Sequence, residues 1–174
     1  MINFALIGCG RIAKKHTDII GGKQIEHVNL AAVCDIKEDL AKGYGEKYGV
    51  PWYTDMHQMM EEMKGNIDAV NILTESGNHA RNTIEIAPYG KHIIVEKPMA
   101  LTLDDADAMI LACDQAGVKL FVVKQNRYNL PVIKLREALE AGRFGKLVMG
   151  TVRVRWCRPQ HYYDQAAWRG TWAM

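Results

Sequence analysis

Apolar segments of strand length alternate with amphipathic segments of helix length through the first 124 residues, and this alternation limits the fold more than any other feature. The apolar segments are residues 2–8, 28–35, 68–73, 91–95 and 118–124, with a short piece at 52–53. The segments of helical periodicity between them are residues 11–21, 37–48, 56–63, 77–89 and 102–116. Strands that are apolar on both sides must be covered on both faces, which predicts a doubly wound parallel α/β sheet between two layers of helices.

The pattern changes after residue 124. Pro131 begins a helical segment that runs to residue 141, and residues 147–157 then alternate apolar and polar side chains, which is typical of a one-sided, antiparallel strand. We therefore expect one domain over residues 1–124 and the beginning of a second over residues 125–174. A lone strand cannot bury its apolar face, so we expect a piece of a longer protein that self-associates through this strand or leaves it disordered.

Composition excludes several classes of protein. The formal net charge is +2, which favours neither a nucleic-acid nor a membrane partner, and no apolar run reaches the length of roughly 18 residues that a membrane span needs. The four cysteines lie far apart without the spacing of a zinc site or a disulfide framework, so we expect no metal site and a cytoplasmic location.

The net charge conceals an asymmetry along the chain. Residues 1–118 carry 11 basic and 17 acidic side chains, whereas residues 119–174 carry 11 basic and 3 acidic side chains. Either the two segments have different tasks, or the acidic partners of the second lie outside this chain. Arg153, Arg155 and Arg158 could accordingly form a solvated face or attract an anionic sugar nucleotide, since arginine binds carboxylates and phosphates in a fork.

A glycine motif follows the first strand and begins the first helix. In this GxGxxA sequence, Gly8 permits a tight turn, Gly10 lets the backbone approach a pyrophosphate, and Ala13 lets the helix pack closely on the strand. Asp35 ends the second strand, where a carboxylate accepts hydrogen bonds from adenosine ribose and repels a 2′-phosphate. Because no glycine–lysine pair is followed by Ser or Thr, as a P-loop requires, the motif predicts a dinucleotide site that prefers NAD.

The second candidate site is Glu96-Lys97-Pro98, directly after the strand at 91–95. A lysine at the carboxyl edge of a parallel strand points into the crevice where ligands bind. Nicotinamide chemistry on an alcohol needs a group that handles the hydroxyl proton, and a lysine can hydrogen-bond that oxygen. The alternative is an ordinary surface lysine at the end of a strand.

The segments GCGRIAKKH, EKPMAL and QNRYN together resemble the Gfo/Idh/MocA family of nicotinamide-dependent sugar oxidoreductases. WRGTW at residues 168–172 is similar to a subgroup of that family, the bacterial UDP-N-acetylglucosaminuronate 3-dehydrogenases (the WlbA/WbpB type) of surface-polysaccharide synthesis. The resemblance covers the whole chain and is strongest over its first 130 residues. It implies a Rossmann domain followed by an α+β domain with a large open sheet, which would bind substrate and join the subunits of a homo-oligomer.

The resemblance also implies roles for individual residues. It makes Lys97 catalytic and places Lys97 and Arg127 at the substrate. At the cofactor it places Gly8, Gly10, Arg11, Ile12, Asp35, Thr74, Ser76, His79, Glu96, Lys97, Asn126, Trp168 and Arg169. Read without the family, a histidine early in a helix, such as His79, can simply cap or pack. His16, one turn after Ile12, is interpreted as a packing residue.

Two departures from the family limit these expectations. The family usually has Pro after the threonine that corresponds to Thr74, whereas this chain has Glu75, so the loop over the cofactor can differ in shape. The family also has a Gly-x-His-x-x-Asp segment after WRGTW, whose His and Asp reach the substrate and whose His is the expected base. This sequence does not contain that segment, and we expect it to bind NAD without turning over substrate.

The leading hypothesis is the cofactor-binding part of an NAD-dependent dehydrogenase. Hydride would leave a ring secondary alcohol of a sugar nucleotide, namely C3 of a UDP-N-acetylamino-uronic acid. One alternative keeps the family but takes a free sugar or inositol as substrate. Another is a non-catalytic NAD-binding module.

Overall fold

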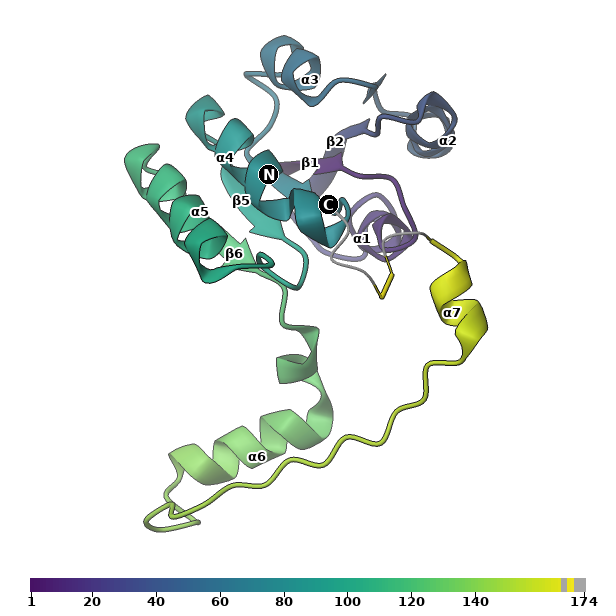
Figure 1. The fold of residues 1–174 in the computed structure, drawn as a ribbon. Helices are drawn as coiled ribbons and strands as arrows, with labels where there is room; N and C mark the ends of the chain where they lie inside the picture. Colours follow the sequence, from purple (N-terminus) through teal and green to yellow (C-terminus); the bar gives the residue numbers. More distant parts are fainter. Residues whose placement is uncertain (167–168, 171–174) are drawn as a thin grey trace. The chain divides into compact units, whose positions relative to one another are not determined.

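Six parallel strands form a single sheet in the order β3-β2-β1-β4-β5-β6 in a computed structural model that describes residues 1–166 and 169–170 (Figure 1). The strands are β1 (Ile2–Ile7), β2 (Val28–Cys34), β3 (Trp52–Tyr53), β4 (Ala69–Ile72), β5 (His92–Val95) and β6 (Leu120–Val122). Neighbouring strands pair in parallel throughout. The predicted doubly wound parallel sheet is therefore confirmed.

The helices that connect these strands are α1 (Ala13–Ile20), α2 (Glu38–Tyr48), α3 (Met56–Glu62), α4 (His79–Ile86) and α5 (Leu103–Gln115). The expected single helix over residues 77–89 is instead α4 between two short 3₁₀ turns, η1 (Ser76–Asn78) and η2 (Ala87–Tyr89). Pro88 explains the change at the second turn, because it lacks the N–H that would continue the α-helical ladder.

Two apolar clusters cover the two faces of the sheet. Ala13 and Ile20 of α1 are buried in one cluster, and Tyr44 and Tyr48 of α2 pack against it. The cluster on the opposite face receives buried side chains from α3, α4 and α5, namely Met59, Met60, Ile86, Met109 and Cys113. Helices thus lie on both sides of the sheet (Figure 1), and burial of this apolar area is the main source of stability.

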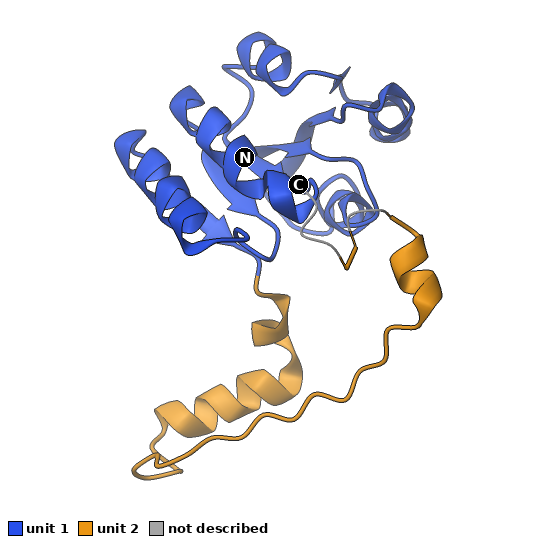
Figure 2. Ribbon diagram, viewed as in Figure 1, with its two compact units in different colours: residues 1–123, 174 blue, residues 124–173 orange. Residues whose placement is uncertain are grey.

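The chain divides into two compact units, the first over Met1–Val123 and the second beginning at Lys124 (Figure 2). The second unit contains the 3₁₀ turn η3 (Gln125–Tyr128) and the helices α6 (Leu130–Glu140) and α7 (Gln160–Asp164). The strand expected at residues 147–157 is absent: this segment forms neither helix nor strand, and Val148, Val152, Val154 and Trp156 are exposed. Alternating side chains create one apolar face, but a strand also needs a neighbour for its backbone hydrogen bonds, and the described residues provide none.

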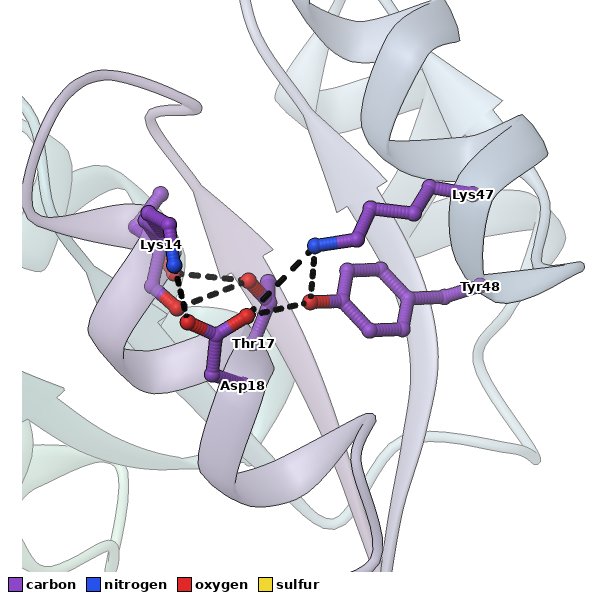
Figure 3. A network of polar contacts seen from close by, with 6 residues as sticks. Lys14, Thr17, Asp18, Lys47 and Tyr48 are labelled. Atoms are coloured by element: carbon purple, nitrogen blue, oxygen red, sulfur yellow. Dashed lines mark hydrogen bonds and ion pairs between the residues drawn. The ribbon is translucent and has the colours of Figure 1, made fainter.

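A polar network on the surface of the first unit joins α1 to α2 (Figure 3). The carboxylate of Asp18 on α1 pairs with Lys14 at 2.5 Å and accepts a hydrogen bond from the Tyr48 hydroxyl at 3.0 Å. Lys47 on α2 reaches the same carboxylate at 3.4 Å and the Tyr48 oxygen at 2.8 Å. The network connects the first two helices along the sheet face that they share.

We expect Asp18→Asn to remove a pH-dependent part of the stability. Hydrogen bonds from Lys14 and Tyr48 lower the pKa of Asp18 from 3.8 to about 2, so the ionised carboxylate stabilises the folded chain above its ordinary pKa. That contribution is lost as the pH falls towards 2. Urea unfolding of both proteins across this range checks the sign, with exposed Asp114→Asn as control. A difference in unfolding free energy that does not shrink on acidification would contradict it.

No helix in the described part of the chain is both long enough and apolar enough to cross a membrane.

Candidate functional site

The carboxyl ends of β1, β2, β4 and β5 meet at one edge of the sheet, because all four strands are parallel neighbours. From β1 the chain crosses to β2 and β3 on one side, then returns to place β4 on the other. Such a reversal next to the first strand creates a crevice at the carboxyl edge, where open α/β sheets bind ligands. The residues that follow these four strands include Gly8, Asp35, Thr74 and Lys97.

The glycine turn packs tightly against the end of β4. Gly8 has a φ of +100°, and its amide donates to the carbonyl of Cys34 at 2.8 Å, which extends the pairing of β1 with β2. A Cβ at this position would lie 2.7 Å from the backbone carbon of Leu73 and 2.8 Å from the amide nitrogen of Thr74. Both the conformation and the space therefore require glycine.

The rest of the turn leaves open space ahead of the first helix. A Cβ built on Gly10 meets nothing within 4 Å, so the backbone there is accessible. Arg11 is exposed, whereas Ile12 packs against the apolar cluster beneath and precedes α1. In a diphosphate site, the N–H groups of the first helical turn that lack an intrahelical partner point towards the ligand.

Asp35 faces the glycine turn. Its Oδ2 accepts a hydrogen bond from the amide of Cys9 at 2.7 Å, and its Oδ1 accepts one from the amide of Lys37 at 2.8 Å. The carboxylate that follows β2 is thereby held beside the loop that follows β1. This is the arrangement that the spacing of the motif predicts.

Cys9 lies between the two motif glycines but is not a candidate nucleophile. Its side chain is 2 % exposed, and burial, with a smaller effect of Asp35, raises the pKa of its thiol to about 12. The thiol is therefore protonated near neutrality and acts as a packing group.

The loop after β4 carries the next three predicted residues. Thr74 is half-buried, and its buried hydroxyl has no partner in the described structure, which leaves it able to bind a ligand or water. Ser76 is half-buried in η1. His79 differs from both, because its ring is 1 % exposed and both ring nitrogens contact backbone carbonyls, of Pro98 at 2.7 Å and Thr74 at 3.0 Å. It therefore connects two loops of the site, and cofactor contact by His79 stays a prediction.

Glu96 and Lys97 follow β5. The carboxylate of Glu96 is 8 % exposed and accepts a hydrogen bond from the backbone amide of Lys97 at 3.1 Å. Lys97 is exposed, and within the described part of the chain its ammonium group makes no hydrogen bond or ion pair. The lysine is thus free to meet a ligand at this edge.

The sequence interpretation missed the role of His16. Its Nε2 lies 3.0 Å from Oε1 of Glu96, and its Nδ1 lies 3.2 Å from the side-chain nitrogen of Asn71 on β4. A packing histidine would be surrounded by apolar groups, whereas this one links α1 to β4 and to the residue that follows β5. The available signal was the polar Asn71 inside the otherwise apolar strand β4.

The remaining predicted residues belong to the second unit or lie outside the described residues. Asn126 and Arg127 are exposed in η3. The guanidinium of Arg169 donates to the carbonyl of Tyr162 at 2.7 Å and lies 4.5 Å from the centre of its ring. Trp168 lies outside the described residues. Their predicted roles at cofactor and substrate stay predictions.

The first unit fits a dinucleotide such as NAD. The open space at Gly10 would admit a diphosphate, the backbone amides ahead of α1 would bind it, and the Asp35 carboxylate lies beside that turn as a ribose acceptor. No group of three or more His, Cys, Asp or Glu side chains arranged for a metal ion occurs among residues 1–166 and 169–170.

Comparison with known proteins agrees with this geometry. Residues 2–124 match the oxidoreductase family described as having an NAD-binding Rossmann fold. The chain is 36% identical over 146 residues to myo-inositol 2-dehydrogenase of Thermotoga maritima, covering 83% of this chain and 42% of that protein. It is 33% identical over 153 residues to D-apiose dehydrogenase of Paraburkholderia graminis, covering 87% of this chain and 40% of that protein.

Among solved structures, the WlbA dehydrogenase from Bordetella pertussis, in complex with NADH and UDP-GlcNAcA, superposes with a TM-score of 0.89 at 43% identity. The match covers 97% of this chain and 52% of that one. The chain thus spans about half the length of that structure, and somewhat less of the two dehydrogenases above. The chain belongs to the Gfo/Idh/MocA oxidoreductase family and has the NAD-binding Rossmann fold of that family over residues 2–124.

Proposed function

We propose that this chain is the cofactor-binding part of a cytoplasmic NAD-dependent dehydrogenase that oxidises a ring secondary alcohol of a sugar nucleotide. The observation that carries the proposal is the meeting of the Gly8–Gly10 turn, Asp35 and Lys97 at one edge of a parallel sheet. A group that binds the diphosphate, an acceptor for the ribose and a lysine that hydrogen-bonds the substrate hydroxyl are parts that nicotinamide oxidation of an alcohol needs from this half of a site. The four free cysteines agree with a reducing compartment.

The chain's own residues divide the work between binding and proton handling. The amides ahead of α1 hold the diphosphate, and Asp35 holds the adenosine ribose through its carboxylate oxygens. When bound, NAD supplies the hydride acceptor. The exposed ammonium of Lys97 would hydrogen-bond the substrate hydroxyl and thereby orient the carbon that loses hydride. The hydroxyl proton would pass to the histidine base expected in the family's segment after WRGTW, since an ammonium group cannot accept it.

The substrate we propose is a UDP-N-acetylamino-uronic acid, oxidised at C3 in surface-polysaccharide synthesis. The identity of 43% with a dehydrogenase solved with UDP-GlcNAcA supports it, as does the excess of basic residues after residue 118. Such a substrate carries a carboxylate and a diphosphate, both of which arginine binds well. We further propose that residues 125–174, with Asn126, Arg127, Trp168 and Arg169, begin the substrate domain.

A free cyclic polyol or sugar is the second candidate substrate, because the chain is 36% identical to an inositol dehydrogenase. Competition separates the two. If the site takes a sugar nucleotide, UDP should bind the NAD-saturated full-length protein and inhibit turnover competitively. If it takes myo-inositol or apiose, those compounds should be oxidised and UDP should have no effect.

We expect Asp35→Ser to weaken NADH binding about 10- to 100-fold, since it removes the charged acceptor of a ribose hydrogen bond worth about 1.5–3 kcal/mol. NADPH binding should weaken less or improve, because the carboxylate that repels a 2′-phosphate is gone. Calorimetric titration of the chain with both dinucleotides measures the change, with exposed Asp114→Asn as the matched control. A wild-type chain that ignores millimolar NADH would refute the proposed function.

We also propose that the protein forms homo-oligomers through the segment at residues 147–157. Val148, Val152 and Val154 are 75–90% exposed and Trp156 is 73% exposed, and apolar segments without a partner promote pairing between copies. Sedimentation velocity should show species larger than a monomer, and the double variant Val152→Lys, Val154→Lys should shift the chain towards the monomer. A monomer that is well ordered through residue 157 would contradict this expectation.

A further inference from the structure

Two histidines from different helices anchor the residues on either side of Lys97. His16 of α1 contacts the side chain of Glu96, and His79 of α4 contacts the carbonyl of Pro98. Lys97 itself is exposed. The lysine therefore projects from a short stretch of backbone whose two neighbours are fixed, while its own side chain remains free.

The anchor on the first side works through the carboxylate of Glu96. One oxygen lies 3.0 Å from Nε2 of His16, and the other accepts the backbone N–H of Lys97 at 3.1 Å. Burial raises the pKa of Glu96, whereas the hydrogen bonds from His16 and from the Lys97 amide lower it. The net result is a pKa below the ordinary value of a glutamate. The ionised carboxylate is thus turned back onto the backbone of the residue that follows it.

Asn71 contacts the second ring nitrogen of His16. It is 1 % exposed on β4, and its side-chain nitrogen, as assigned, lies 3.2 Å from Nδ1 of His16. In this amide orientation the nitrogen donates to Nδ1 and the ring N–H at Nε2 donates to Glu96, while Oδ1 of Asn71 has no partner in the described structure. Asn71, His16 and Glu96 are therefore linked in sequence by hydrogen bonds, and the Glu96 carboxylate also accepts the backbone N–H of Lys97.

The anchor on the second side is a different kind of contact. His79 is 1 % exposed, with Nδ1 at 2.7 Å from the Pro98 carbonyl and Nε2 at 3.0 Å from the Thr74 carbonyl. Carbonyl oxygens only accept, so the ring N–H of His79 donates to one of the two carbonyls while the other ring nitrogen lies against the second. His79 thereby connects the segment after β5 to the loop after β4.

Building on the function proposed above, we propose that His16 and His79 are positioning residues for Lys97. They would fix the point from which its ammonium group reaches the substrate hydroxyl. A lysine side chain is flexible, so the place of its backbone limits where the ammonium group can act. A displacement of about 1 Å at a reacting group can lower turnover by about 10²-fold. Neither histidine is assigned contact with the substrate.

Two isosteric variants of His16 test the first anchor in the full-length protein. In His16→Gln the side-chain nitrogen can take the place of Nε2 and still donate to Glu96, whereas in His16→Asn the amide is too short to do so. We expect kcat to fall about 10- to 100-fold in His16→Asn and to stay within about threefold of wild type in His16→Gln, with the KM for NAD unchanged in both.

The pH profile provides a readout that a merely structural role would not move. Burial raises the pKa of Glu96, while His16, the Lys97 amide and the Lys97 charge lower it, so loss of the hydrogen bond from His16 should raise this pKa relative to the wild type. In His16→Asn the carboxylate should therefore be protonated at a higher pH than in the wild type, and kcat should gain an acid limb. Hydrogen exchange at the Lys97 amide should accelerate in the same variant.

The variant His79→Gln tests the second anchor, and its kinetic parameters should differ from those of both His16 variants. Because His79 also holds the Thr74 carbonyl, we expect the KM for NAD to rise together with a fall in kcat. His57→Gln is the control, since His57 lies on the exposed part of α3 and contacts Tyr89 rather than the site. It should leave every parameter unchanged.

Equal kcat values for His16→Gln and His16→Asn, whether both normal or both reduced, would overturn the assignment of His16. An unchanged pH profile in a His16→Asn protein with reduced kcat would overturn it as well. A failure of the proposed function would be recognised by a different result. In that case Lys97→Met would turn over substrate normally, whatever the kinetics of the histidine variants.

Discussion

Lys97→Met should abolish substrate oxidation by the full-length protein while leaving its affinity for NAD nearly intact. Methionine is about as long as lysine but lacks the ammonium group that we propose to hydrogen-bond the substrate hydroxyl. Removal of a hydrogen-bond donor from the reacting oxygen costs about 10²- to 10³-fold in turnover, so kcat should fall by about that factor. Cofactor affinity should change by less than about twofold, since the Lys97 ammonium has no partner in the described structure and the diphosphate and ribose contacts lie elsewhere.

Lys91→Met is the matched control for this substitution. Lys91 lies just before β5, at the opposite end of the strand from Lys97, and its ammonium group donates to the carbonyl of Lys64. Steady-state kinetics and a fluorescence titration with NADH distinguish the two variants. Normal turnover by Lys97→Met would refute the assigned role, and loss of NADH binding would show that the lysine serves the cofactor instead.

Gly8→Ala and Gly10→Ala should fail in different ways, although the two glycines are separated by one residue. At Gly8 an alanine would have to adopt a φ of +100° and place its Cβ 2.7 Å from the backbone of Leu73. Left-handed backbone alone costs a non-glycine residue about 1–2 kcal/mol, and the contact with backbone adds to this. We expect a loss of at least ~2 kcal/mol in unfolding free energy, and loss of NADH binding with it.

At Gly10 the fold should tolerate alanine, because a Cβ there meets no atom within 4 Å. That same space is where the diphosphate would approach the backbone, so NADH affinity should fall at least tenfold with little change in stability. Gly43→Ala is the control: it lies exposed in α2, a Cβ there meets nothing within 4 Å, and alanine should stabilise the helix by up to about 1 kcal/mol.

Urea unfolding and NADH titration of the three variants together decide the matter. If Gly8→Ala unfolds at the wild-type urea concentration, the close approach to Leu73 does not constrain the turn. If Gly10→Ala binds NADH as tightly as the wild type, the diphosphate does not lie against this backbone, and the assignment of the motif is wrong.

The periodicity of apolar residues was enough to predict the sheet and its helices, because it reflects the repeat of the backbone within each segment. Five of the strands were predicted from apolar runs of strand length. The helix α3 was predicted from methionines at i, i+3, i+4 and i+7, of which Met59 and Met60 are buried. The motif spacing likewise predicted that Asp35 would face the glycine turn, since adjacent parallel strands end at the same edge.

Periodicity was misleading where the structure depends on a partner. The alternation over residues 147–157 predicted a strand, but a strand is completed by hydrogen bonds to a neighbour, and none is present among the described residues. An amphipathic pattern records which face of a segment is apolar and carries no information about what covers that face.

The sequence alone therefore determined the parallel sheet, the glycine turn with its carboxylate, and the lysine at the carboxyl edge, since each follows from local spacing and strand polarity. Only the tertiary structure decided that His16 meets Glu96, 80 residues away, and that His79 joins the loops after β4 and β5. Those contacts depend on the packing of α1 and α4 against the sheet. The packing of the helices brings these side chains to hydrogen-bonding distance, whereas the spacing of residues along the chain does not determine which distant side chains meet.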